Sequence, residues 1–530
     1  MRTRTTLLLL AALVLVAAAS GLAQPRGKTV LVAAPAIPET LDPIFTGSRM
    51  SRYVRDTLYD VVPTFGVAKD ERGNLVVDLE KGPICNLCES FQFSPDKTKW
   101  IIKFRPGVRS PAGNELTAED ARWSFDRMLK AGSPSHRGFF GIFSVDAANP
   151  VTVIDKYTWE INMTAPEVSL MATWAAPHPF GKIYDTAEIK KHAKPDDPWG
   201  NEWLKTHIAG FGPWVVDKYT PGKELELRRN PNYHQRGLPA VDRVIFREVP
   251  SEATRAALLR SGSVDLALEL PPRLVESVRG VRGIKTVDVG GNEWMTWLLN
   301  QKTPPFDDVR VRRAVAHAAP VREILKTVYL DKPWVKRWDG YAPANYMGSP
   351  VTWPYDENLD KARALLKEAG KEKVAFELIY EKEVAGSEEI AVIIKSQLAK
   401  IGVDVDLKGL APAQYSEQYR SRKAQSVLFK DASWGHDGRY WLATFFHSKG
   451  PVNHGNHMNP EFDKLVDEIT PVADLKQRAA LSKRAHELLV QDAPWAFAIG
   501  TGFSLPMRDT LGGFVWRVNN WVDVRTLEKN

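Results

Sequence analysis

Strand–helix–strand units occur in two separate parts of this chain of 530 residues, and they constrain its fold more than any other feature. The first unit consists of strands at 243–248 and 264–268 around a helix over 251–261. The second consists of strands at 376–380 and 403–407 around a helix over 388–401. Each unit implies parallel pairing of its two strands across a helical crossover. Two such units far apart in the chain predict two α/β lobes.

Between the first strand of the chain, at 28–34, and the first of these units lies a block of a different kind. Its pattern predicts a hairpin of strands at 91–93 and 100–104, a helix that begins after Thr117, and two more strands at 151–154 and 158–163. Strands gathered before and after a single long helix are typical of a small α+β unit. We therefore expect an α+β subdomain inserted into the first lobe.

Residues 1–23 have the pattern of a secretory signal. A positively charged start is followed by an apolar run over 7–18 and by small residues over 21–23. The apolar run is shorter than the ~20 residues that span a bilayer, which disfavours a membrane anchor. No cysteine directly follows it, so there is no thiol to carry a lipid. The sequence predicts export to the periplasm as an untethered protein.

The composition disfavours nucleic-acid binding and gives no sign of an enzyme. The formal net charge of +7 includes two arginines of the signal, and the remainder is too dilute over this length to bind nucleic acid. The sequence contains no Gly-x-Ser-x-Gly, His-Glu-x-x-His or phosphate-loop motif, so we predict no catalytic residue and no cofactor. The 17 tryptophans favour aromatic binding surfaces.

The only two cysteines, Cys85 and Cys88, are separated by two residues. In an oxidising compartment a local disulfide that fixes a loop is the favoured interpretation. A thioredoxin-like redox pair is the alternative, but that motif opens a helix after a strand, and no helical pattern follows here. Metal binding would need further ligands nearby.

A series of short motifs in order along the chain resembles the extracellular solute-binding proteins of peptide and nickel ABC transporters, the family 5 group. The motifs lie at 40–43, 104–108, 116–120, 210–214, 227–233, 259–265, 305–314 and 361–370. The resemblance implies an α/β fold of the two-lobe periplasmic-binding-protein type (type II, cluster C-like), with an inserted α+β subdomain and a hinge of two strands.

The resemblance also implies domain boundaries and a function. The core of lobe I is expected at 24–60, 205–267 and 498–530, the inserted subdomain at 61–204 and lobe II at 268–497, with crossings near 266–270 and 493–500. We expect a monomer that captures short peptides between its lobes and delivers them unchanged to an ABC permease. The alternatives are a nickel chelate, an opine or an oligosaccharide as the ligand, or an exported hydrolase.

The stretch 430–441 combines aromatic rings with a carboxylate at the end of an apolar strand. Trp434 offers a stacking face and Asp437 an acceptor for a cation, although buried tryptophans with Asp437 as a helix cap would give the same pattern. Oligopeptide-binding relatives have a Trp-x-x-Asp here, which implies Asp437 as the acceptor of a peptide's ammonium and Trp434 as a pocket wall. The residues that commonly follow are replaced by 438–440, and Tyr440 is a further candidate ligand-binding residue. His436 is either a pocket residue or solvated.

Two further segments are candidate walls of the site. One segment lies just before a predicted helix and consists of Thr46, Gly47, Ser48 and Arg49. Backbone N–H groups there can donate to a ligand carboxylate or to an ordinary capping side chain. In the strand 292–300, Trp294 and Thr296 alternate with Trp297, and the resemblance places a binding strand here without fixing its ligand face, core packing being favoured for Trp297.

Three histidines of a later loop, His447, His454 and His457, leave a metal site open as an alternative. Loop histidines without a fixed scaffold are more often solvated. We therefore predict no metal.

Overall fold

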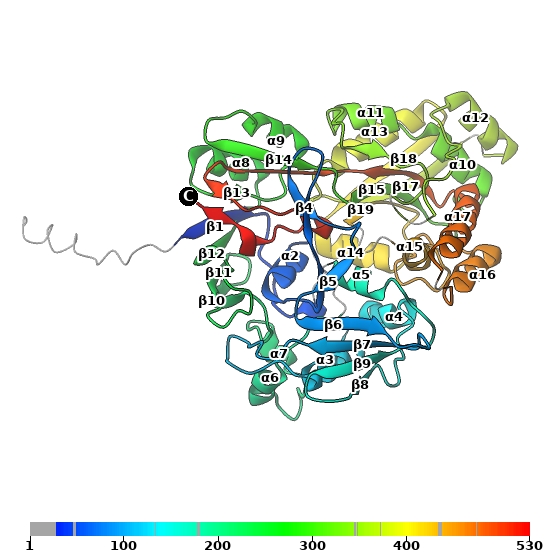
Figure 1. The fold of residues 1–530 in the computed structure, drawn as a ribbon. Coiled ribbons are helices and arrows are strands. Elements are labelled where there is room, and N and C mark those ends of the chain that lie inside the picture. The colour runs from blue at the N-terminus through cyan, green and yellow to red at the C-terminus, as the bar shows by residue number, and fades with distance from the viewer. Residues whose placement is uncertain are drawn as a thin grey trace, which may run out of the picture.

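The structure is a computed structural model, and the residues that it describes are 28–45, 49–132, 134–176, 181–343, 346, 348–371, 373–432, 437–472 and 474–530. The predicted signal over 1–23 lies outside these ranges. Two lobes stand side by side, with the inserted subdomain below them (Figure 1). The predicted two-lobe α/β fold is confirmed. No helix in the described ranges combines the length and the apolar character needed to cross a membrane.

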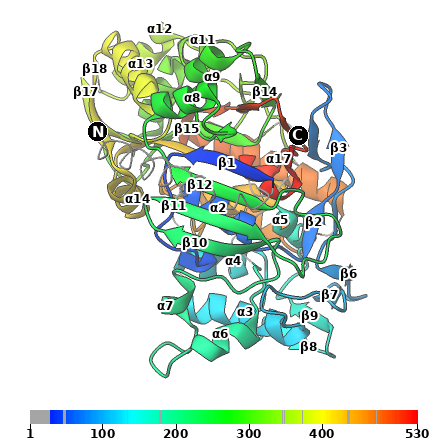
Figure 2. The same ribbon diagram turned by 90° about the vertical axis from the view of Figure 1, so that its left-hand side faces the viewer.

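Lobe I is built on a sheet of seven strands in the order β10-β11-β12-β1-β13-β21-β14. The strands are β1 (Thr29–Ala34), β10 (Trp214–Thr220), β11 (Glu224–Arg229), β12 (Arg243–Glu248), β13 (Leu266–Ala267), β14 (Ile284–Val289) and β21 (Phe503–Arg508). The two strands of the first strand–helix–strand unit, β12 and β13, are parallel, but they do not pair directly, because β1 lies between them and pairs in parallel with each. Figure 2 shows β10, β11, β12 and β1 lying next to one another above the inserted subdomain.

Helices cover both faces of this sheet. They are α2 (Arg49–Leu58), α8 (Glu252–Ser261) and α9 (Pro272–Val278). Side chains alternate along β1, so that Val32 packs in the cluster that contains Val54 of α2, while Ala33 packs with Leu259 of α8 on the opposite face. Burial on both faces explains why this strand is a continuous apolar run.

Lobe II is built on a sheet of six strands in the order β16-β20-β15-β19-β17-β18. The strands are β15 (Glu293–Leu299), β16 (Lys336–Arg337), β17 (Val374–Glu381), β18 (Val403–Leu410), β19 (Ser426–Ala432) and β20 (Trp495–Gly500). The helices are α10 (Val309–Ala318), α11 (Val321–Thr327), α12 (Leu359–Glu368), α13 (Ser387–Ala399), α14 (Pro412–Arg420), α15 (Gly438–Phe445), α16 (Pro460–Ile469) and α17 (Leu475–Asp492). β17 and β18 are parallel, as the second unit predicts.

The inserted subdomain has an antiparallel sheet of four strands in the order β6-β7-β9-β8. Its strands are β6 (Cys88–Phe93), β7 (Lys99–Phe104), β8 (Val151–Val153) and β9 (Thr158–Asn162), and its helices are α3 (Ala118–Ala131), α4 (Pro134–Ile142), α5 (Leu170–Ala175), α6 (Thr186–His192) and α7 (Asn201–Leu204). At the start of α3 the carboxylate of Asp120 accepts a hydrogen bond from the backbone N–H of Thr117 at 2.8 Å. This reciprocal cap is the helix start that the sequence predicts.

The remaining elements are short and lie at the edges of lobe I and the inserted subdomain. They are η1 (Pro43–Phe45), β2 (Pro63–Phe65), β3 (Val67–Lys69), β4 (Leu75–Val77), β5 (Pro83–Cys85), β22 (Leu511–Gly512), η2 (Val518–Asn520), η3 (Val524–Thr526) and β23 (Glu528–Lys529).

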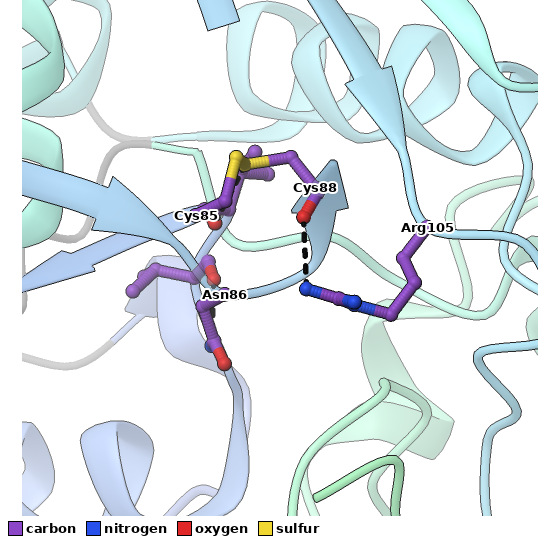
Figure 3. Close-up of a disulfide and its surroundings, with 6 residues drawn as sticks. Cys85, Asn86, Cys88 and Arg105 are labelled. Atoms are coloured by element: carbon purple, nitrogen blue, oxygen red, sulfur yellow. Dashed lines mark hydrogen bonds between the residues drawn. A yellow bond between two sulfur atoms is a disulfide. The ribbon is translucent and has the colours of Figure 1, made fainter. Parts of the chain in front are cut away.

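The loop between β5 and β6 is fixed by the disulfide Cys85–Cys88 (Figure 3). The side chain of Arg105 donates to the carbonyl of Cys88 at 3.3 Å, and the amide of Asn86 donates to the carbonyl of Val61 at 2.9 Å. The disulfide therefore lies in a corner that is also anchored to the segment between α2 and β2.

The two crossings between the lobes lie at 290–292, between β14 and β15, and at 501–502, between β20 and β21. This corrects the positions expected from the sequence, 266–270 and 493–500. The stretch 268–289 adds α9 and β14 to lobe I, whereas β20 still belongs to lobe II. Gly291 and Gly502 have φ of +57° and +64°, and a Cβ on Gly291 would come within 3.0 Å of the Gly502 backbone. The two crossing segments are in contact because glycine occupies both positions.

Candidate ligand-binding site between the lobes

A cavity of about 90 Å³ lies between the two lobes, directly beside the crossings. Lobe I contributes Tyr53, Glu269, Glu276 and Leu505 to its walls, and lobe II contributes Glu293, Tyr329, Lys332 and Lys430. Small-molecule pockets typically have volumes of about 300 to 1,000 Å³. A ligand of that size therefore requires the lobes to move apart, and it would touch both lobes once they close again.

The cavity walls carry charges of both signs. The ammonium of Lys430 lies 3.3 Å from the carboxylate of Glu293 on the neighbouring strand. The ammonium of Lys332 in lobe II lies 2.8 Å from the carboxylate of Glu276 in lobe I, so this ion pair joins the lobes. Burial favours a raised pKa for Glu276, but hydrogen bonds from Lys332 and Arg279 outweigh it and lower that pKa.

Glu269 occupies the turn after β13, where the chain leaves the lobe I sheet. Its φ of 55° lies in the left-handed region, which is unusual for a residue with a side chain. Its carboxylate lies 3.1 Å from the hydroxyl of Tyr53 on α2. A charged side chain is thus carried into the cavity wall by a strained backbone, a combination that recurs at ligand sites.

The candidate strand β15 packs into the core on both faces. Trp294, Thr296 and Trp297 are each 0% exposed. The indole of Trp294 stacks on Trp495 with ring centroids 4.9 Å apart, and the hydroxyl of Thr296 donates to the carbonyl of Phe497. Side chains on both faces of this strand pack in the core, and the expectation that one face meets ligand stays a prediction. Glu293, the first residue of β15, is the one that lines the cavity.

The segment after β19 is described only in part. Trp434 and His436 lie outside the described residues, as do Thr46, Gly47 and Ser48 before α2, and Arg49 is the first residue of that helix. Asp437 is 6% exposed and caps α15 by accepting the backbone N–H of Tyr440 at 2.9 Å. Its carboxylate also pairs with the guanidinium of Arg478 at 2.9 Å. The structure therefore places Asp437 in the alternative role of a helix cap and outside the cavity wall.

Asp437 belongs to a buried ion network that joins lobe II to the inserted subdomain. The network consists of Asp437, Arg439, Arg478 and Glu167, and it is called here the interlobe ion network. The two oxygens of Glu167 bind Arg478 at 2.9 Å and Arg439 at 2.8 Å. Next to it, Tyr440 stacks on Phe143 of the inserted subdomain with ring centroids 5.6 Å apart. Tyr440 is thus an interlobe contact residue, and burial raises its pKa well above the usual value.

The three loop histidines are buried rather than solvated, which corrects the favoured expectation. His457 hydrogen-bonds the carboxylate of Asp492 at 2.9 Å and the carbonyl of Phe446 at 2.7 Å. The rings of His454 and Tyr419 lie edge to face, and burial lowers the pKa of His454 to about 3. His447 lies beside Asp463. Across the described ranges, no group of three or more His, Cys, Asp or Glu side chains is arranged to hold a metal ion.

The sequence reasoning missed the charged residues that line the cavity, above all Glu269, Glu293 and Lys430. A usable signal was present for two of them, because Glu293 begins the largely apolar strand β15, and Lys430 directly follows the apolar run of β19. In open α/β sheets ligands bind at the carboxyl ends of parallel strands, where β13 leads into Glu269. Nothing local predicts that these ends face one another, since they come from different lobes.

Three comparisons place the chain among known proteins. A family model described as "Bacterial extracellular solute-binding proteins, family 5 Middle" matches residues 82–453. The probable D,D-dipeptide-binding periplasmic protein DdpA of Escherichia coli K12 is 24% identical, with 92% of this chain and 91% of the relative covered. Di/tripeptide-binding protein 2 of Pseudomonas aeruginosa is 26% identical, with 91% of each covered.

Solved structures share the fold. The ABC transporter-associated periplasmic binding protein DppA of Helicobacter pylori, in complex with the peptide STSA, superposes with a TM-score of 0.83 at 21% identity and covers 95% of this chain and 98% of that one. Proteins of this family are binding proteins of transport systems rather than enzymes. Since the family match spans more than half of its length, this chain belongs to the bacterial extracellular solute-binding proteins of family 5.

Proposed function

We propose that this protein is the periplasmic solute-binding component of an ABC importer, and that it captures short peptides between its lobes and releases them chemically unchanged. The observation that carries the proposal is the cavity beside the crossings, whose walls come from both lobes and bear both carboxylates and ammonium groups. A peptide with free termini carries the same two charges, so each end meets a wall of opposite sign.

Binding of this kind signals through the positions of the lobes. A ligand that touches both lobes stabilises the closed arrangement by its differential affinity for that arrangement. A shift from mostly open to mostly closed needs about 5 kcal/mol of differential binding. Two charge-assisted hydrogen bonds and some backbone bonds can supply it. The closed form is then the form that a membrane permease recognises.

Two independent lines of evidence favour peptides over the other candidate ligands. The relatives named above are described as dipeptide-binding and di/tripeptide-binding, and the structural neighbour holds a four-residue peptide. The charged wall suits a zwitterion better than a neutral oligosaccharide. The predicted signal over 1–23 supports export to the periplasm. We infer a monomer that works without a cofactor or catalysis and whose protein partner is the permease at the inner membrane.

Isothermal titration of the purified protein tests this function. We expect di-, tri- and tetrapeptides to bind and a nickel–histidine chelate, an opine and an oligosaccharide to bind at least about 100-fold more weakly. Peptide recovered after a long incubation should have its original mass. Small-angle scattering should show a smaller radius of gyration with peptide than without. Tight binding of a non-peptide ligand alone, or cleavage of the peptide, would overturn the proposal.

A further inference from the structure

A second cavity, of about 20 Å³, lies where lobe I meets the inserted subdomain, and it shares no wall residue with the cavity between the lobes. Its walls come from α2 and the loop after it, from the inserted subdomain and from the C-terminal segment 517–525. The charged side chains in these walls are Asp56, Asp60, Lys182, Arg517 and Arg525. A water molecule needs about 10 to 15 Å³ of such volume. The cavity therefore has room for a single small particle.

We propose that this cavity binds one small monovalent anion, chloride or a halide of similar size, between Lys182 of the inserted subdomain and Arg517 of the C-terminal segment. The anion compensates a surplus of buried positive charge and links these two parts of the chain. The site does not touch the peptide, so the inference stands or fails independently of the proposed function.

Asp60 is one of the two carboxylates in the walls, and donors of the protein engage both of its oxygens. One oxygen pairs with the guanidinium of Arg525 at 2.7 Å. The other accepts from the hydroxyl of Tyr233 at 2.8 Å and lies 3.3 Å from the ring of His234. Burial alone would raise the pKa of Asp60, but the charge of Arg525 and these hydrogen bonds outweigh it and lower that pKa. A cation that entered the cavity would have to compete with these partners.

Asp56, the other carboxylate, is engaged by two cations. Its oxygens accept from the guanidinium of Arg55 at 2.7 and 2.8 Å, and one of them lies 3.1 Å from the ammonium of Lys182. That ammonium also donates to the carbonyl of Tyr59 at 3.3 Å. An ammonium has three donors, and these two acceptors, which are its acceptors within the described residues, use two of them. Lys182, at 2% exposed, therefore keeps one N–H for an occupant of the cavity.

Arg517 provides a second donor without a partner. Its side chain is 12% exposed, and one terminal nitrogen lies 3.2 Å from the carboxylate of Asp523. Its Nε is buried and finds no hydrogen-bond acceptor in the part of the chain that the structure describes. Leaving a buried donor of a charged group unpaired is costly, so an acceptor is expected there. An anion in the cavity supplies that acceptor.

The balance of charge favours the same occupant. The ion pairs around the cavity connect four cations with three carboxylates, namely Arg55, Lys182, Arg517 and Arg525 with Asp56, Asp60 and Asp523. His234 beside Asp60 can add only positive charge. Buried charges persist when they are compensated, and one monovalent anion compensates this set. Loss of the proton of Lys182 is the other way to remove the surplus, since burial lowers the pKa of that ammonium. Only the first way makes stability depend on chloride.

The test measures the thermal unfolding of the purified protein in sodium chloride and in sodium gluconate at equal ionic strength. Gluconate is too large for a cavity of about 20 Å³, so it controls for general effects of salt. We expect Tm to rise with chloride by about 1 to 3 °C and then to level off, because a ligand of the folded state alone stabilises that state. Bromide should act like chloride, and crystals grown with bromide should show an anomalous scattering peak between Lys182 and Arg517.

Lys182→Met and Arg517→Gln each remove one of the two donors, and each should abolish the rise of Tm with chloride. The matched control is Arg312→Gln, which removes a buried guanidinium of lobe II that donates to the carbonyls of Phe306 and Asp492, each at 2.8 Å. It should lower Tm and keep the rise. If Lys182→Met does not fold, Arg517→Gln and the bromide peak decide. Equal Tm of the wild type in both salts, a rise that persists in Arg517→Gln, or a cavity without a bromide peak overturns the inference.

Discussion

Two of the contacts between the lobes, the interlobe ion network and the cavity beside the crossings, differ in that the first holds the lobes together and the second can bind a ligand. The interlobe ion network has two carboxylates and two guanidiniums, each ion-paired with a group of opposite charge, and the side chains of Glu167 and Arg478 are 0% exposed. The cavity beside the crossings has carboxylates and ammonium groups around a space of about 90 Å³. Carboxylates facing cationic side chains thus hold the lobes together where the charges pack directly, and can bind a ligand where space remains between them.

The difference has an energetic reason. Burying an ion pair costs desolvation energy that its own attraction offsets only when the geometry is good, so such a pair adds little to stability, but removal of one partner leaves a costly unpaired charge. The ion network therefore specifies one closed arrangement. In the cavity the side chains of Lys332, Glu276 and Lys430 are 16% to 29% exposed, and a ligand can compete for their charges. Substitutions in the two places should differ accordingly.

The largest effect is expected for Glu167→Ala. This change removes the carboxylate that binds both Arg439 and Arg478, and it should destabilise the closed arrangement by about 3 to 5 kcal/mol, because two guanidiniums then lose a buried partner. Small-angle scattering of the variant with saturating peptide should give a larger radius of gyration than the wild type. A radius equal to that of the wild type would mean that the network does not hold the lobes together.

Asp437→Asn should have a smaller effect of a different kind. Asparagine still caps α15, but it loses the charge that pairs with Arg478, so we expect a loss of about 1 to 3 kcal/mol in the stability of the closed form. The ratio between the affinity for the free peptide and the affinity for its N-acetylated form should stay at the wild-type value. Titration with both peptides measures it. If the free and the N-acetylated peptide instead bind the variant equally well, Asp437 is the acceptor of the peptide's ammonium.

The sequence predicted elements better than it predicted their surroundings. Local periodicity was enough for β12, β17 and β18 and for the start of α3, because each depends on residues within a short window. Local periodicity could not predict that Trp294 is buried. It is enclosed by Trp441 and Trp495, which lie far along the chain and come together only in the folded lobe. A strand covered on one face and a strand covered on both can have the same local pattern.

The candidate site shows the same limit. Glu293 and Lys430 lie in segments that the sequence analysis selected. The prediction there named the aromatic residues and did not include these two charges. Glu269 was identified only through the φ of its backbone and its position in the cavity wall, and neither can be read from the neighbouring residues. The crossings were misplaced for a related reason, since α9 and β14 resemble further elements of either lobe.

The ion pair between Glu276 and Lys332 should make closure depend on pH. The pKa of Glu276 is lowered in the folded protein from a reference value of 4.5. Its contribution is therefore fully present above pH 4.5 and is lost as the pH falls through the lowered value. Because the side chain is 29% exposed, solvent screening keeps the contribution below about 1 kcal/mol. Scattering from the wild type and from Glu276→Gln should differ at pH 7 and converge at low pH. A constant difference would remove this pair from closure.

The smallest effect is expected for Arg273→Gln, and it sets the scale for the others. Arg273 of α9 reaches Glu389 of lobe II at 3.0 Å, so it too is an ion pair between the lobes, but the two side chains are 63% and 44% exposed. Exposed pairs contribute about 0 to 1 kcal/mol, since water and salt screen them and the side chains lose freedom in pairing. Peptide affinity should change less than about threefold.

Comparing the small expected effect of Arg273→Gln with the large one of Glu167→Ala tests whether burial of the ion pair causes the difference. Both substitutions remove a charge that connects the lobes, and they differ chiefly in burial. If Arg273→Gln opens the protein as much as Glu167→Ala, burial is not what separates a holding contact from a surface pair. If its effect stays small in low salt and disappears in high salt while that of Glu167→Ala persists, then desolvation of the partner left behind accounts for the difference.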